Sequence, residues 1–281
     1  MEGSELADVD IESIYLALRN CLVIVGKVAI FFVVAKALIE LPVHLNTNLG
    51  PNIPWSIPAA AALLAAWTAW LAPKWIPREI SIVTSIGGWV AALILLSVLA
   101  SLAVLIFWGA LFSLVAGGQS AGPKASPMLG IAWALAFPIL GAFYEEITFR
   151  GILQGNLERL LGRTGSFVVV ACIFVGMHGW NPGFVAQFGF YVAIAVTTGL
   201  AVQFTRSITP AIAIHAIANG ALAALILSRG SLNFGQLALR HLLLAATLSV
   251  ASAVGIYLTV ARLDRAERGA TDRGCEPETP R

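Results

Sequence analysis

Charged residues are scarce in this chain, and their scarcity sets its class. Only 11% of the 281 residues are charged, whereas 58% are hydrophobic, and the mean hydropathy is +0.86. In soluble globular domains roughly a quarter of the residues are charged. A composition so poor in charge excludes an ordinary soluble protein and predicts a polytopic membrane protein whose main surroundings are lipid.

The chain also lacks a large net charge, cysteines at the spacing of a known motif, and a leader signal. The formal net charge is +2, without a basic cluster interleaved with aromatics, so no nucleic-acid partner is expected. Cys21, Cys172 and Cys275 have neither metal-ligand nor disulfide-framework spacing, so no metal or other cofactor is expected. The first residues are acidic and lack the basic region and cleavage site of a secretory signal. We therefore expect the first hydrophobic segment to stay in the protein.

Hydrophobic runs, in contrast, are long and many. Crossing about 30 Å of hydrocarbon takes about 20 helical residues, and runs of this order are separated by joints rich in Pro and Gly. The sequence predicts an all-α transmembrane helix bundle of about eight spans. Their approximate limits are Cys21–Leu41, Ser56–Leu71, Ser85–Ala116, Met128–Gln154, Phe167–Gly179, Phe184–Phe204, Ile208–Leu227 and Leu239–Ala261.

The distribution of basic residues predicts the topology. An even number of spans places both termini on one side, and cytoplasmic loops are enriched in Lys and Arg. With both termini in the cytoplasm, 12 of the 17 Lys and Arg fall on the cytoplasmic side, three fall outside and two lie in the first span. We expect an acidic cytoplasmic segment over 1–20, one transmembrane domain over 21–261 and a polar cytoplasmic tail over 262–281.

Charges inside the spans need partners, because burying a charge in the bilayer is costly. Lys36 and Glu40 are four residues apart and are predicted to pair. Glu146 and Arg150 have the same spacing and are predicted to form a shielded ion pair. Glu145 points about 100° away from Glu146 on a helix. Its partner is therefore expected on another span.

Histidines in two later spans are the candidates for that partner. FVGMH ends at His178, and HAIAN runs from His215 to Asn219. The imidazole and the amide of HAIAN share one helical face, about 6 Å apart along the axis. Counted from the expected cytoplasmic ends, Glu145, His178, His215 and Asn219 lie about 15, 17, 10 and 16 Å deep. The sequence thus predicts that all four occupy one layer.

A carboxylate, two imidazoles and a carboxamide are a suitable set for hydrolysing an amide bond. Glu145 can take a proton from water as a general base, and His178 can hold that water. His215 and Asn219 can donate hydrogen bonds to the oxyanion of the tetrahedral intermediate. This chemistry requires no nucleophilic Ser or Cys.

Three short motifs also resemble those of one protein family. EEITFR (145–150), FVGMH (174–178) and HAIAN (215–219) are similar, in order and spacing, to the EExxxR, FxxxH and HxxxN motifs of the CAAX protease and bacteriocin-processing family. That family consists of intramembrane glutamic endopeptidases and includes the Ras-converting CAAX endopeptidase. The region that carries the resemblance covers about 128–227.

The resemblance implies roles and a location. It implies that Glu145 and His178 activate water while His215 and Asn219 form the oxyanion site. Glu146, Arg150 and Phe174 are expected to support them. It further implies a peptide or lipidated protein substrate and a site reached from the cytoplasmic side. We expect the protein to lie in the prokaryotic cytoplasmic membrane.

Three alternatives remain open at this point. A zinc metalloprotease could use Glu145, His178 and His215 as ligands, although the chain has no HExxH motif and Asn219 would then have no role. A proton-coupled transporter would also need membrane Glu and His, although no internal repeat is visible. A membrane scaffold or immunity protein would use the same residues only structurally. The sequence does not choose between a prenylated CAAX substrate and another peptide.

Overall fold

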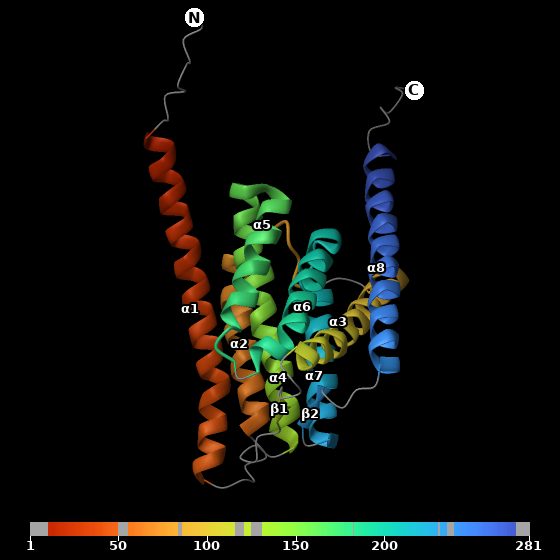
Figure 1. Ribbon diagram of the computed structural model, residues 1–281. Helices are drawn as coiled ribbons and strands as arrows, with labels where there is room; N and C mark the ends of the chain where they lie inside the picture. The colour runs from red at the N-terminus through yellow and green to blue at the C-terminus, as the bar shows by residue number, and fades with distance from the viewer. Residues whose placement is uncertain are drawn as a thin grey trace, which may run out of the picture.

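The computed structural model describes residues 11–49, 56–83, 86–115, 121–124, 131–181, 183–229, 231–234 and 239–273. The chain forms a bundle of long helices (Figure 1). In order, its elements are α1 (Ile11–Leu49), α2 (Ser56–Trp75), α3 (Gly88–Val115), β1 (Ala121–Lys124), α4 (Ile131–Glu146), the π-helix η1 (Ile147–Gln154), α5 (Gly155–Met177), α6 (Phe184–Thr205), α7 (Thr209–Arg229), β2 (Ser231–Asn233) and α8 (Leu239–Arg273).

Seven helical stretches in the described residues are long and apolar enough to cross a membrane. The fourth runs over Ala134–Met177, 44 residues, and joins two spans that the sequence predicts separately. It cannot be straight, because 33 residues of helix separate Glu145 from His178 by about 50 Å, yet these side chains approach to 3.7 Å. The reversal occurs at Gly162, whose φ of 69° and ψ of 175° are not helical. The observed helices are therefore consistent with eight crossings.

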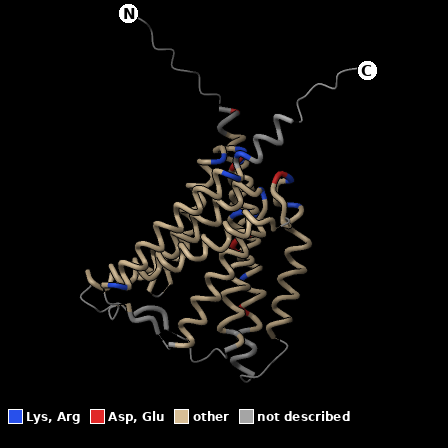
Figure 2. Tube along the Cα trace, turned by 90° about the vertical axis from the view of Figure 1, so that its right-hand side faces the viewer, with Lys and Arg blue, Asp and Glu red and all other residues tan. Residues whose placement is uncertain are grey.

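The two ends of the described chain lie at the same end of the bundle. The start of α1 and the end of α8 are both at the top of Figure 1. Most of the Lys, Arg, Asp and Glu positions also gather toward that end (Figure 2). Both features agree with an even number of crossings and with the predicted charge asymmetry. We refer to this part of the molecule as the polar end.

Helices extend farther than the hydrophobic runs suggest. The predicted cytoplasmic tail is helical as far as Arg273, and the predicted N-terminal segment is helical from Ile11. The loop expected before Phe167 is also helix on both sides of Gly162. The rest of the predicted terminal segments, including Cys275, lies outside the described residues.

Two ion pairs connect the part of α5 just before Gly162 to neighbouring loops. Arg206 donates to both carboxylate oxygens of Glu158, at 2.8 and 2.9 Å. Arg159 donates to both oxygens of Glu79, at 3.0 and 3.1 Å. The carboxylate of Glu79 is also hydrogen-bonded to its own backbone, and this bond, followed by Arg159, lowers its pKa. These contacts tie the reversal to the loops after α2 and α6.

A short ribbon joins two connections far apart in the sequence. Strands β1 and β2 pair antiparallel, with Ala121 opposite Asn233 and Lys124 opposite Ser231. The ribbon connects the segment after α3 to the segment after α7. It is a small addition to the all-α architecture that the sequence predicts, which is otherwise confirmed.

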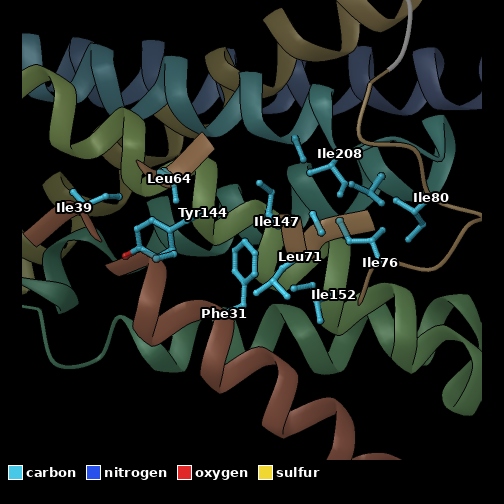
Figure 3. Packing of buried hydrophobic residues seen from close by; sticks show 14 of the residues in the cluster. Phe31, Ile39, Leu64, Leu71, Ile76, Ile80, Tyr144, Ile147, Ile152 and Ile208 are labelled. Carbon is cyan, nitrogen blue, oxygen red and sulfur yellow. The ribbon is translucent and has the colours of Figure 1, made fainter. Parts of the chain in front are cut away.

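A buried apolar cluster packs α1 and α2 against α4, η1 and the start of α7. Figure 3 shows Phe31, Leu71 and Ile147 from three of these elements at its centre. The backbone of η1 comes very close to its neighbours here, because a Cβ on Gly151 would lie 2.7 Å from Cδ1 of Ile208. Only glycine allows this approach without displacing a neighbour. The cluster thereby fixes the position of the EEITFR motif.

Candidate active site

The EEITFR motif lies where α4 changes into a π-helix. η1 continues directly from Glu146, and all eight of its residues are buried, including Thr148, Arg150 and Gln154. The sequence predicts a regular α-helix as far as Gln154, so this wider turn is a difference from the prediction. π-helical turns are rare and often lie at functional sites. Here the turn carries three polar side chains into the centre of the bundle.

Glu146 has two partners. Its Oε2 lies 3.5 Å from Nε of Arg150, and both side chains are fully buried, which confirms the predicted ion pair. Its Oε1 lies 2.8 Å from Nδ1 of His215. The sequence did not predict this second contact, since it paired Glu146 with Arg150 alone. Glu146 therefore links the end of α4 to α7.

Arg150 is held mainly by α6. Its Nε donates to Oγ1 of Thr198 at 2.9 Å and its Nη2 donates to the carbonyl oxygen of Ala195 at 3.3 Å. Its guanidinium lies 4.8 Å from the centre of the Phe174 ring, a separation typical of a cation–π contact. Arg150 is thus fixed from three sides, by Glu146, by α6 and by α5.

Phe174 contacts both histidines as well. Its ring centre lies 4.6 Å from that of His178 and 5.7 Å from that of His215. Its ring also packs edge-on against Phe149 at 5.4 Å. A single buried ring therefore touches side chains of all three motifs, which agrees with the supporting position expected for it.

Glu145 faces both histidines with one oxygen. Its Oε2 lies 3.7 Å from Nε2 of His178 and 3.9 Å from Nε2 of His215. Both distances are too long for a direct hydrogen bond. This oxygen is buried and has no hydrogen-bond partner among the described residues. Polar groups separated in this way are commonly bridged by one water molecule.

Exposure divides the cluster into two parts. The side chains of Glu145 and His178 keep 16% and 15% of their surface exposed, whereas those of Glu146 and Arg150 keep none. His215 lies between the two parts with 4% exposed. A reactant can therefore reach Glu145 and His178 far more readily than the ion pair beneath them.

Hydrogen bonds assign the imidazole protons. Nδ1 of His178 lies 2.8 Å from the carbonyl oxygen of Phe174, which can only accept. This nitrogen therefore carries a proton, and Nε2 of the neutral ring is left as an acceptor facing Glu145. Nδ1 of His215 can donate in the same way to the carboxylate of Glu146. Both rings thus turn Nε2 toward Glu145.

Asn219 lies farther along α7. Its amide donates to the carbonyl oxygen of Pro138 at 3.2 Å, and Pro138 precedes Glu145 by about two helical turns. Three of the four predicted side chains, Glu145, His178 and His215, therefore lie close together. Asn219 lies about 6 Å beyond His215 along the helix. A carboxamide has two N–H donors, so one remains for another acceptor.

Two side chains that contact the motifs, Thr198 and Tyr191, are not among the residues that the sequence predicts for the site. Thr198 binds Arg150, and Tyr191 stacks on His178 with ring centres 4.3 Å apart. A signal existed for the second, because Phe184, Phe188 and Tyr191 recur at helical spacing and place three rings on one face of α6. A single threonine in an apolar span gave no comparable signal.

The set of acidic and imidazole groups also bears on the zinc alternative. Among the residues that the structure describes, no three His, Cys, Asp or Glu side chains are arranged so that they could hold a metal ion. No observation of the described site therefore favours a metal-dependent mechanism over one that uses Glu145 alone.

Comparison with known proteins agrees with the motif pattern. The family model described as type II CAAX prenyl endopeptidase Rce1-like matches residues 127–221, a range that contains all three motifs. No curated protein and no solved structure matches the chain. The family match confirms the resemblance that the motifs predict.

Proposed function

We propose that this chain, an integral membrane protein matching the Rce1-like CAAX prenyl endopeptidase family, is a glutamic endopeptidase with Glu145 as its general base. The match supports a membrane endopeptidase in general. One observation carries the finer assignment. A buried carboxylate oxygen without a hydrogen-bond partner among the described residues faces Nε2 of two imidazoles at 3.7 and 3.9 Å.

The first step is the activation of water. A water molecule between Glu145 and His178 donates one proton toward Oε2 of Glu145 and the other toward Nε2 of His178. Attack of its oxygen on the scissile carbonyl transfers the first proton to Glu145 and forms the tetrahedral intermediate. Glu145 then returns this proton to the leaving nitrogen as the C–N bond breaks, and is ionised again.

The oxyanion requires hydrogen-bond donors from α7. The second N–H of the Asn219 amide can supply one. His215 can supply another through Nε2 only when its ring carries both protons, because Nδ1 already donates to Glu146. The Glu146 carboxylate, 2.8 Å away, would pair with the resulting positive charge. In this scheme Glu146 acts through His215, while Arg150 and Phe174 hold Glu146 and the rings in place.

The substrate is a membrane-associated peptide or protein, and the matched family's description adds a candidate chemistry, a prenyl group on a CAAX cysteine. The polar end, where charges and both ends of the described chain gather, is proposed to face the cytoplasm (Figure 2). Matched fluorogenic CAAX peptides with and without a farnesyl group would measure the preference directly. A prenyl-specific enzyme would cleave only the farnesylated peptide.

The central test compares Glu145→Gln with Glu40→Gln in purified, detergent-solubilised protein. Glu40 is a matched control because it is also an acid within a span, paired with Lys36 at 3.6 Å as the sequence predicts. Loss of the general base should lower kcat about 100- to 10,000-fold. The control should cleave at the wild-type rate.

Two outcomes would contradict the proposal. Full activity of Glu145→Gln would remove Glu145 as the base. Abolition of wild-type activity by a chelator, with rescue by zinc, would replace the glutamic mechanism with a metal-dependent one. Parallel measurements on His178→Ala would show whether the water has a second essential partner.

A further inference from the structure

His178 lies at a helix terminus. It follows the last residue of α5 and forms the end of that helix, with φ of −86° and ψ of −7°. Helix ends fray, and among the described residues the ring makes one hydrogen bond, between Nδ1 and the carbonyl oxygen of Phe174. That bond and the tilted ring of Phe174, whose centre is 4.6 Å away, hold the imidazole from its own helix. Both contacts come from the end of α5, so a contact from another helix is needed to hold Nε2 in place when that end frays.

That contact comes from α6. The ring of Tyr191 stacks on the ring of His178, with centres 4.3 Å apart and planes inclined by 28°. Phe184 also stacks with Tyr191, with ring centres 5.7 Å apart and planes inclined by 18°. Three rings from the end of α5 and the first half of α6 thus form one column.

The turn between the helices anchors this column. Nδ2 of Asn181 donates to the hydroxyl of Tyr191 at 3.3 Å. The backbone of Asn181 donates to the carbonyl oxygen of His178 at 2.9 Å and accepts from the N–H of Phe184 at 3.0 Å. The turn that ends at α6 is therefore bonded both to the histidine and to the tyrosine that covers it.

We propose that Tyr191 is a positioning residue that fixes the imidazole of His178 in the orientation needed to hold the attacking water. The inference rests on the proposed role of His178. Tyr191 acts through the face of its ring, and its hydroxyl serves to anchor that ring on Asn181. A ring that tilts would move Nε2 away from Oε2 of Glu145, and a misplacement of about 1 Å can lower a rate about 100-fold.

The kinetic test uses three variants of α6. Tyr191→Leu removes the stacking face and should lower kcat about 10- to 100-fold, with KM changed little because the proposed role is exerted through His178. Tyr191→Phe keeps the ring and should stay within about threefold of wild type, since only its anchor is lost. Phe188→Leu is the matched control, because its ring contacts Trp108 and Phe184. Its kcat should equal that of wild type.

A spectroscopic measurement separates this inference from the proposed function. In protein labelled with ¹³C in its histidine rings, and assigned with His178→Gln, the ring protons of His178 should be shifted upfield by the face of Tyr191. Tyr191→Leu should remove that shift, and Phe188→Leu should retain it. This readout does not depend on peptide cleavage.

The outcomes are distinct. Loss of the shift with unchanged kcat would overturn the positioning role, although the endopeptidase would stand. A loss of activity in Tyr191→Phe as large as in Tyr191→Leu would also overturn it, by assigning the effect to the hydroxyl. If the shift responds to the variants as expected but the wild-type protein cleaves no peptide, the contact would be supported and the proposed function refuted.

Discussion

Replacement of Arg150 by methionine tests the buried ion pair most directly. Methionine has a similar length and flexibility but no charge, so it fills most of the space. The substitution leaves Glu146 fully buried with its Oε2 facing no cation, while the bonds to Thr198 and Ala195 are also lost. The remaining contact of Glu146, to His215, does not involve this oxygen.

The expected cost is large because neither member of the pair reaches solvent. Removing one partner of a buried ion pair costs about 3–5 kcal/mol, since the other charge is left uncompensated. A surface pair contributes far less, because water and salt screen it. Arg159→Met provides the comparison, since Arg159 and Glu79 are 62% and 55% exposed although their contact is shorter, at 3.0 Å.

The assay is reversible unfolding of the purified protein in mixed micelles with increasing SDS, followed by circular dichroism. Arg150→Met should unfold at a clearly lower fraction of SDS, whereas Arg159→Met should be close to wild type. The double variant Arg150→Met with Glu146→Gln should recover part of the loss, because the neutral amide can still accept from His215. The reasoning would be refuted if the two single arginine variants were equally stable.

Two other predictions concern the reversal of the chain at Gly162 and the proposed oxyanion donor Asn219. Gly162→Ala should destabilise the protein by about 1–3 kcal/mol, because its backbone conformation is one that only glycine adopts readily, and nothing lies within 4 Å of the added methyl group. Gly26→Ala, in an equally open position within α1, should not lower the thermal midpoint, and an equal loss in both would argue against backbone strain. Asn219→Ala should lower kcat about 100- to 1000-fold with little change in KM, as expected for loss of an oxyanion donor. A raised KM with unchanged kcat would instead assign Asn219 to substrate binding.

Local spacing explains what could be predicted. The pairs Lys36–Glu40 and Glu146–Arg150 are four residues apart, so the geometry of one helix is enough to bring each pair together. The spans follow in the same way from hydropathy and length. These predictions are confirmed because each depends on residues close together along one continuous stretch of helix.

The remaining features depend on contacts between elements. The bond between Glu146 and His215 joins the end of α4 to α7, and nothing in either motif sets the rotation of one helix against the other. A π-helical turn has no sequence signature comparable to that of a helix cap. It also changes the local geometry, so depths calculated with the regular rise of an α-helix do not hold across it. Tyr191 is aligned with His178 only because the turn after α5 sets the start of α6.

The two helical segments on either side of Gly162 are nearly equal in length, and this has a consequence for the region that the family model matches. Glu145 lies 17 residues before this glycine and His178 lies 16 residues after it. The two segments therefore form a hairpin whose register returns the histidine to the level of the carboxylate. An insertion of one residue in either segment would rotate one side chain by about 100° and displace it by about 1.5 Å. Changes of length should be tolerated only when they restore both rotation and level, so this stretch is expected to accept substitutions far more readily than insertions or deletions.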